Sequence, residues 1–256
     1  MNLFKKKLNF EKNKFFIFLP NLLELVPIHL LSVLALNDLI GIDTQKNKII
    51  YNTSKFIFGR KCNNILLWGA KGMGKSTLIK SVVKHFEKHN LTYIEIFPNS
   101  IHYIPEIVYY LSAFNQKFII YIDDLNLKSD DKNFTMFKTI IEGSCLTDLN
   151  NIKFYVSSNL RHIAHKNHKN NSDFSNINST EASENLLALS DRFGLWVGFH
   201  KINKNQYLKI IEHYLRKNSI NISPEIMNAA VRWSVEKGSY SGRTAWQFVN
   251  DLSPDD

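Results

Sequence analysis

The stretch from residue 64 to residue 77 constrains the fold more than any other part of the chain. A short apolar run, NILLW, leads directly into a glycine-rich turn, GAKGMGKST, and the following residues have the apolar spacing of a helix. The turn matches the pattern G-x-x-x-x-G-K-[ST] from Gly69 to Ser76. The chain must therefore build a strand, a tight turn and a helix in immediate succession.

The residue types in this turn predict phosphate binding. Glycines let backbone N–H groups curl around phosphate oxygens, and the N-terminus of the following helix adds favourable partial charge. We expect Lys75 to reach the β- and γ-phosphates of a nucleotide, the Ser76 hydroxyl to ligate Mg²⁺, and Thr77 to lie near the α-phosphate. The glycines expected to shape the turn are Gly69, Gly72 and Gly74.

From residue 40 onward, helical and strand patterns alternate. Helices are predicted over residues 43–59, 75–90, 105–114 and 134–143, and strands over residues 64–68, 91–97, 117–122, 152–158 and 195–200. This alternation predicts an α/β fold with a five-stranded parallel sheet covered by helices on both faces. After His200 only helical patterns follow, at residues 203–218, 223–238 and 241–252, and these predict a small helical lid.

The first 36 residues are basic at the start and then apolar. Pro20, Asn21, Glu24, Pro27 and His29 interrupt the apolar run. The run therefore stops short of the roughly 20 apolar residues that a spanning helix needs. We predict an amphipathic helical arm over residues 1–36 without stable membrane insertion, and keep peripheral membrane binding as an alternative. The predicted division is then an arm at 1–36, an α/β nucleotide-binding domain at 37–200 and a helical lid at 201–256.

Composition limits the classes of partner and compartment. The 256 residues suffice for one substantial core with a small satellite. The formal charge of +9 favours an anionic partner, although Lys, Asn and Ile are abundant throughout and weaken that argument. Cys62 and Cys145 form neither a disulfide framework nor a zinc-type spacing, so a reducing cytoplasm is expected.

A second acidic motif, FIIYIDD, follows the glycine-rich turn at the distance expected of a neighbouring strand. Asp123 is predicted to face the Mg²⁺ water shell, and Asp124 to face the γ-phosphate, where a base can orient the attacking water. These two motifs alone are compatible with a small-molecule kinase, a GTPase, a recombinase-like core or an AAA+ ATPase.

Four further stretches, in chain order, resemble the motifs of AAA+ ATPases. In DLIGIDTQK, Ile42 resembles the apolar contact to adenine, and in FYVSSN, Asn159 occupies the position of the sensor-one side chain. In SDRFG, Arg192 resembles the arginine finger that reaches into a neighbouring subunit's ATP. In YSGRTAWQF, Arg243 resembles the sensor-two arginine that reads the γ-phosphate. The resemblance extends from residue 38 to residue 250.

A narrower resemblance covers most of the chain. The stretches NNILLWGAKGMGKSTLIK, IIYIDDL, YVSSNLRH, LSDRFGLWVGFH and SGRTAWQF look like the bacterial AAA+ family catalogued as domain of unknown function 815. This resemblance implies an ATP-binding module whose client is not established. The pair Asp123-Asp124 stands where the wider AAA+ pattern has Asp-Glu, and the shorter base implies slow hydrolysis.

We therefore expect an ATPase that binds ATP and Mg²⁺, forms a homo-oligomer with nucleotide and remodels or loads an unknown protein or nucleoprotein client. A trans arginine at Arg192 makes the active site incomplete in a monomer. Because the sequence ends soon after residue 252, we also expect no C-terminal helix-turn-helix or winged helix of the kind found in replication initiators. Two alternatives stay open: a DNA-binding ATPase of the helicase-loader or transposition-helper type, and an ATP-gated binding protein with negligible turnover.

One polar loop remains, over residues 161–185, and we expect it to be exposed. It contains His162, His165 and His168 at every third position, but no paired carboxylate cluster accompanies them. We therefore do not expect these histidines to bind a metal ion.

Overall fold

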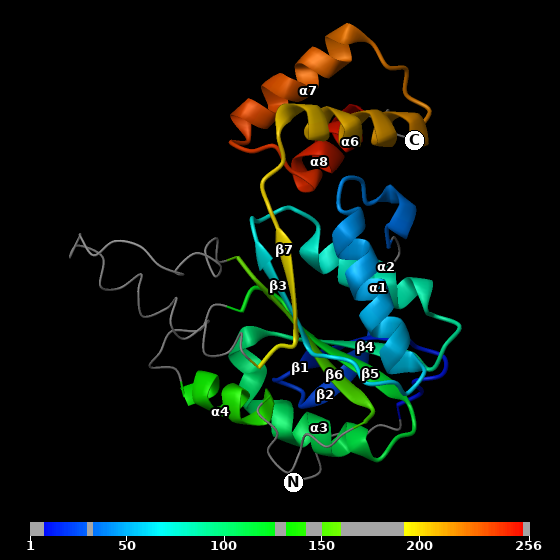
Figure 1. Cartoon of the computed structure of the whole chain (residues 1–256), viewed down its shortest axis with the longest axis vertical. Helices are drawn as coiled ribbons and strands as arrows, with labels where there is room; N and C mark the ends of the chain where they lie inside the picture. Colours follow the sequence, from blue (N-terminus) through cyan, green and yellow to red (C-terminus); the bar gives the residue numbers. More distant parts are fainter. Residues whose placement is uncertain (1–7, 30–32, 126–131, 142–149, 160–191, 253–256) are drawn as a thin grey trace, which may run out of the picture.

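The computed structural model describes residues 8–29, 33–125, 132–141, 150–159 and 192–252. Figure 1 shows a twisted sheet with helices on both sides and a further group of helices, in the colours of residues 204–252, beyond one end of the strands. The predicted polar loop and its three histidines lie outside the described residues, so their exposure stays a prediction.

Seven strands form one sheet in the part of the chain that the structure describes. They are β1 (Phe15–Leu19), β2 (Glu24–Pro27), β3 (Ile65–Gly69), β4 (Leu91–Ile96), β5 (Lys117–Ile122), β6 (Ile152–Ser158) and β7 (Leu195–Phe199). Their order is β2-β1-β4-β5-β6-β3-β7, and every neighbouring pair is parallel except β1 with β2. The five predicted strands are confirmed as β3 to β7, and the predicted α/β class is confirmed with them.

Helices cover both faces of this sheet (Figure 1). They are α1 (Asp43–Ile57), α2 (Lys75–His85), α3 (Ile104–Ser112) and α4 (Lys132–Ile141), with the short 3-10 helices η1 (Leu36–Asp38) and η2 (Pro98–Tyr103). Along β5, Ile119 belongs to the core formed with α1 and α2, whereas Ile120 belongs to the core formed with α3 and α4. Each face of the sheet therefore has its own core, because successive side chains of a strand point to opposite faces.

The N-terminal segment corrects our prediction of a helical arm over residues 1–36. Strands β1 and β2 form an antiparallel hairpin in which Phe16 pairs with Pro27, and β1 also pairs in parallel with β4. Phe16 and Phe18 are fully buried in the core shared with α3 and α4, while Phe15 packs on the opposite face. The segment extends the sheet from five strands to seven.

The physical reason for this correction lies in the run FFIFL of β1. Aromatic and β-branched residues favour strands, and a short continuous apolar run cannot be distinguished from a buried helix by periodicity alone. Pro27 ends β2, the edge strand, where its missing N–H removes no hydrogen bond from a further strand.

Among the described residues, no helix is both long enough and apolar enough to span a membrane.

The last three helices pack around a separate core, and we call this group the lid. They are α6 (Lys204–Lys217), α7 (Pro224–Glu236) and α8 (Gly242–Leu252). Tyr207, Ile211 and Phe248 are among the side chains buried between them. Figure 1 shows the lid beyond the carboxyl ends of β3 and β7. The predicted helical lid is confirmed as a set of helices, whereas the division into domains at 1–36, 37–200 and 201–256 stays a prediction.

Strand β3 ends against β7 in a contact that only glycine allows. Gly69 pairs with Phe199, and the N–H of Ala70 donates a hydrogen bond to the Phe199 carbonyl oxygen at 3.0 Å. Gly69 has a φ of +123°, and a Cβ atom at this position would lie 2.1 Å from the same carbonyl oxygen. The close approach fixes where the glycine-rich turn leaves the sheet.

We expect Phe18→Ala to destabilise the protein by about 3–5 kcal/mol, because the substitution leaves a cavity in a fully packed core. Chemical denaturation measures this difference in the free energy of unfolding. Leu22→Ala is the control, since Leu22 is 60% exposed in the turn of the same hairpin. Equal effects of the two substitutions would contradict the placement of β1 in the core.

Gly69→Ala should also destabilise the protein, and by more than its backbone conformation alone explains. Gly238→Ala is the matched control, because Gly238 also has a positive φ, +70°, but no atom lies within 4 Å of the added Cβ. We expect about 1–2 kcal/mol for Gly238→Ala. A further loss of roughly 1–3 kcal/mol should accompany Gly69→Ala from the clash with Phe199. Urea denaturation that gives the same value for both variants would refute this contact.

Candidate functional site

The carboxyl ends of β3, β5 and β6 meet beneath the lid. This edge of a parallel sheet is where open α/β folds bind ligands. A cavity of about 760 Å³ lies there, between the glycine-rich turn, the segment before α1 and the lid helices α6 and α8. Lys75, Asp123 and Asn159, which are far apart in the sequence, all line this cavity.

The ammonium group of Lys75 is held at the bottom of the glycine-rich turn. It donates hydrogen bonds to the carbonyl oxygens of Gly69 and Ala70 at 2.8 and 2.9 Å, and to Asn159 Oδ1 at 2.9 Å. The residue is only 6% exposed. Burial lowers the pKa of Lys75 from its usual value, although the charges of Asp123 and Asp124 act in the opposite direction. The cation is therefore fixed where it can meet a phosphate.

Asp123 follows β5 directly and accepts hydrogen bonds from three hydroxyl groups. Ser76 Oγ lies 2.9 Å from both carboxylate oxygens, Tyr121 OH lies 2.9 Å from Oδ1, and Ser157 Oγ lies 2.5 Å from Oδ1. These bonds fix the orientation of the carboxylate next to the first turn of α2. The Ser76 hydroxyl and the Asp123 carboxylate form a pair of hard oxygen ligands of the kind that Mg²⁺ prefers.

Asp124 adopts the left-handed backbone region, with a φ of +53°. This conformation is uncommon for residues other than glycine, although Asp tolerates it better than most. The N–H of Asp124 donates to Ser157 Oγ at 2.8 Å, and its carboxylate accepts a hydrogen bond from Asn159 Nδ2 at 2.5 Å. The side chain is exposed toward the cavity, and it ends a hydrogen-bonded chain that runs from Lys75 through Asn159.

The lid meets the glycine-rich turn through the start of α8. The N–H of Arg243 donates a hydrogen bond to the Gly72 carbonyl oxygen at 3.3 Å. Gly72 has a φ of +80°, and a Cβ atom there would lie 3.1 Å from Ser241 Oγ. Arg243 itself is exposed and lines the cavity. A glycine at position 72 therefore lets the turn and the lid approach closely.

Part of the cavity lining is apolar. Ile42 and the residues just before it form one wall, and side chains of the lid and its connection form the other. A flat apolar base fits between such walls, whereas the opposite end offers cations, hydroxyl groups and backbone N–H groups for phosphates. The apolar residues of these walls, which we call the apolar end of the cavity, include Leu39, Ile40, Ile42, Ile202, Ile210 and Tyr214.

Most of the predicted site residues come together around this cavity. Those that line it are Ile42, Gly72, Gly74, Lys75, Ser76, Thr77, Asp123, Asp124, Asn159 and Arg243. Gly69 lies beneath the cavity, where its carbonyl holds Lys75. Arg192 is exposed and does not line the cavity, because it precedes β7 at the amino end of the sheet. The catalytic and binding roles of these residues stay predictions.

Several residues that contribute to this site were not predicted from the sequence. Tyr121 and Ser157 both donate hydrogen bonds to Asp123, and the position of each in the sequence could have indicated this. Tyr121 lies two residues before Asp123 on the same strand face, and Ser157 is a polar residue near the end of an apolar strand. The exposed Trp246 of α8 also lines the cavity, which its position in a helical pattern did not indicate.

Solved structures similar to this chain share its fold at low sequence identity. A RuvB mutant of Thermotoga maritima has a TM-score of 0.55 at 15% identity, with 84% of this chain and 63% of that chain covered. Orc1 of Aeropyrum pernix in complex with DNA has a TM-score of 0.59 at 15% identity, with 80% and 57% covered. The replication initiator DnaA, bound to AMPPCP and single-stranded DNA, has a TM-score of 0.54 at 15% identity, with 82% and 61% covered.

These likenesses show that the chain has the fold of AAA+ P-loop ATPases, and that it spans less than two thirds of the length of each of the three relatives. A search of curated proteins found no match. The family model described as "Protein of unknown function (DUF815)" matches residues 11–255, and the chain therefore belongs to that family.

Proposed function

We propose that this protein binds ATP with Mg²⁺ and hydrolyses it at an interface between subunits. The observation that carries the proposal is the hydrogen-bonded chain Lys75–Asn159–Asp124 beside the Ser76–Asp123 pair. This arrangement combines a fixed cation, a polar group that positions water and a carboxylate base at one end of the cavity. Together these groups can stabilise charge on the phosphates, align a water on the γ-phosphate and accept its proton.

The glycine-rich turn would hold the triphosphate. Its backbone N–H groups and the N-terminus of α2 would face the phosphate oxygens, and Lys75 would exchange its carbonyl partners for the β- and γ-phosphates. Ser76 and Asp123 fit a magnesium ion, which when bound neutralises charge on the phosphates. Tyr121 and Ser157 would keep the Asp123 carboxylate oriented throughout.

Asp124 would act as the base and Asn159 as its positioning partner. Asn159 holds the Asp124 carboxylate at 2.5 Å and Lys75 at 2.9 Å, so it links the base to the phosphate-binding cation. The exposed Asp124 side chain can accept a proton from a water aligned on the γ-phosphate. Because Asp is one methylene shorter than Glu, we expect slow turnover.

Arg192 would complete the site of a neighbouring subunit. It lies at the amino end of β7, away from its own cavity, so it can serve as a finger only across an interface between copies. The proposed homo-oligomer follows from this requirement. We further propose that ATP turnover drives remodelling or loading of a protein or nucleoprotein client.

The test is ATP hydrolysis per subunit, measured against protein concentration with Mg²⁺. We expect the rate to rise with concentration and to fall by about three orders of magnitude in Arg192→Ala. Asp124→Asn should abolish turnover as well. An equal mixture of the two variants should recover part of the activity, because some interfaces then combine an intact Arg192 with an intact Asp124.

Arg232→Ala is the control for this assay, since Arg232 is also exposed but lies on α7 of the lid. It should leave the rate unchanged. A rate that is independent of concentration and of Arg192 would refute the shared site. Tight ATP binding without turnover at any concentration would instead support an ATP-gated binding protein.

A second candidate function, binding of single-stranded nucleic acid, is favoured by a basic and aromatic surface at the amino end of the sheet. Tyr51 and Phe58, on α1 and directly after it, are 69% and 61% exposed. The Lys55 ammonium lies 5.5 Å from the centroid of the Tyr51 ring. The similar Orc1 and DnaA structures contain DNA. Aromatic rings stack on bases while lysines follow the phosphate backbone, and this surface offers both.

Lysines gather beside these rings. The Cys62 thiol, whose pKa burial raises, feels the opposing charges of Lys153, Lys55 and Lys117. Lys117 begins β5 and Lys153 lies at the start of the neighbouring β6, so both lie toward the end of the sheet opposite the cavity, and the Lys117 ammonium lies 5.3 Å from the centroid of the Phe56 ring of α1. The combined charge of these lysines would attract an anionic polymer.

Fluorescence anisotropy with a labelled single-stranded oligonucleotide tests this second function. Binding should weaken steeply with salt, and the double variant Tyr51→Ala/Phe58→Ala should lose roughly 1–3 kcal/mol of binding free energy for each stacked base. Tyr109→Ala is the control, because Tyr109 is 76% exposed on α3 at the other face of the sheet. No binding at low salt, or an equal loss in the control, would exclude this surface.

A further inference from the structure

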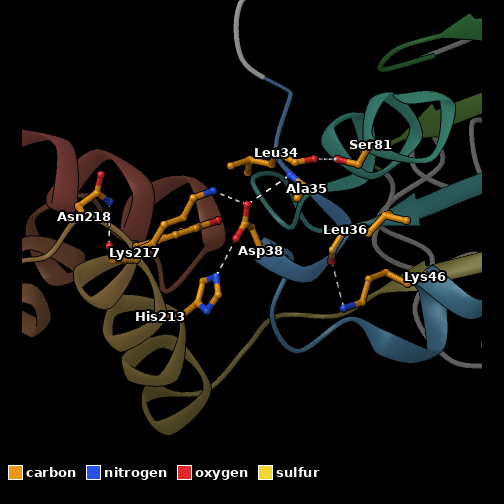
Figure 2. A network of polar contacts seen from close by, with 10 residues as sticks. Leu34, Ala35, Leu36, Asp38, Lys46, Ser81, His213, Lys217 and Asn218 are labelled. Carbon is orange, nitrogen blue, oxygen red and sulfur yellow. Dashed lines mark hydrogen bonds and ion pairs between the residues drawn. The ribbon is translucent and has the colours of Figure 1, made fainter. Parts of the chain in front are cut away.

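A buried carboxylate joins the lid to the rest of the protein. Asp38 ends η1, and its side chain is only 10% exposed. It meets two residues of α6: His213 Nε2 lies 3.0 Å from Asp38 Oδ1, and the Lys217 ammonium bonds to Oδ2. Figure 2 shows these contacts converging on Asp38 from the lid side. Buried carboxylates are stabilised only when they are paired and hydrogen-bonded in this way.

The segment that carries Asp38 is anchored to the helices on one face of the sheet. Ser81 Oγ of α2 donates a hydrogen bond to the Leu34 carbonyl oxygen at 2.7 Å, and Lys46 Nζ of α1 donates to the Leu36 carbonyl oxygen at 3.3 Å. The N–H of Ala35 lies 3.3 Å from Asp38 Oδ2 (Figure 2). Because α2 begins at Lys75, η1 is fixed relative to the helix that leaves the glycine-rich turn.

Both sides of this contact lead directly into the apolar end of the cavity. On one side, residues 39–42 follow Asp38 immediately and line the cavity. On the other side, Tyr214 lines the cavity between His213 and Lys217 in the sequence of α6, and Ile210 lies one turn before it. The Asp38 contact therefore joins the two segments that carry the apolar walls.

The charges of the groups involved favour the contact between Asp38 and α6. Burial raises the pKa of Asp38, but hydrogen bonds from Lys217 and His213, together with the charge of Lys217, outweigh it and hold the pKa below its usual value. The ionised carboxylate is thus stabilised by the lid. Withdrawal of α6 would remove the two hydrogen-bond donors that hold the pKa of Asp38 below its usual value, and the ionised carboxylate would lose that stabilisation.

We propose that Asp38 is a positioning residue that clamps α6 over the base-binding end of the cavity, so that it raises affinity for the nucleoside part of ATP and not for its phosphates. The inference rests on the proposed function, since it needs a nucleotide in the cavity. The phosphate end is held by the turn and by Lys75, whose partners Gly69, Ala70 and Asn159 all lie outside the lid. The two ends can therefore be perturbed independently.

The experiment compares the Kd of the full-length protein for Mg²⁺–ATP with its Kd for Mg²⁺–tripolyphosphate, both by calorimetry. In Asp38→Asn the Kd for ATP should rise about tenfold, within the usual range of coupling between sites. The Kd for tripolyphosphate, which lacks the nucleoside, should change less than about twofold, as for a site that the clamp does not reach.

Lys217→Gln tests the lid side of the same contact. It should raise the Kd for ATP, and Lys217→Arg should restore it, because arginine also donates to the carboxylate. Arg216→Gln is the matched control. It removes the same charge from the neighbouring position of α6, where Arg216 is 72% exposed and lies 3.9 Å from Glu212. In the double variant Asp38→Asn/Lys217→Gln, the two losses should not add, because the residues share one contact.

The possible failures are distinguishable. If the wild-type protein binds neither ligand, the proposed function is wrong and the clamp is excluded with it. If the wild type binds ATP and Asp38→Asn binds it equally well, only the clamp is overturned. An equal loss of affinity for ATP and tripolyphosphate also overturns the clamp, since Asp38 would then act on the whole cavity. Lys217→Gln replaces a half-exposed residue, so it keeps the test valid if Asp38→Asn does not fold.

Discussion

The burial of the Lys75 ammonium group is the interaction on which the rest of the site depends. A buried cation is tolerated only with good hydrogen-bond acceptors around it, and here the carbonyls of Gly69 and Ala70 and the amide of Asn159 supply them. Those acceptors come from the ends of two neighbouring strands, β3 and β6. The position of the cation therefore depends on the register of β3 and β6. A shift of that register would separate the carbonyl acceptors on β3 from the Asn159 amide that follows β6.

Much of the fold could be predicted because its signals are local. The strands β3 to β7 are short apolar runs bounded by turn residues, and the helices between them have clear apolar spacing. The N-terminal hairpin could not be predicted in the same way. Its strands have no alternation, since Phe15 and Phe16 are buried on opposite faces, and β1 is held in the sheet by its pairing with both β2 and the distant β4. Contacts between distant segments decided its structure.

In the candidate site, too, the residues with local sequence signals could be predicted and those that depend on distant contacts could not. Residues of the glycine-rich turn were predictable because their chemistry follows from their spacing in one short stretch. Tyr121 reaches Asp123 from the same strand, β5, whereas Ser157 reaches it from the neighbouring strand β6, and that contact depends on sheet register. Asp38 depends on a contact with a helix that lies 175 residues further along the chain. Arg192 cannot be assessed from one copy, because its proposed partner belongs to another.

The connection between β7 and the lid has a mechanical consequence. Strand β7 ends at Phe199, and α6 begins at Lys204, so only residues 200–203 separate them. Phe199 is also bonded to the backbone of the glycine-rich turn through Ala70. The lid and the glycine-rich turn are thus both attached to the end of β7, the lid through four residues of backbone and the turn through one hydrogen bond. The start of the lid therefore has the same anchor as the backbone that surrounds the phosphates, and it keeps that anchor when α6 loses its contact with Asp38 further along the helix.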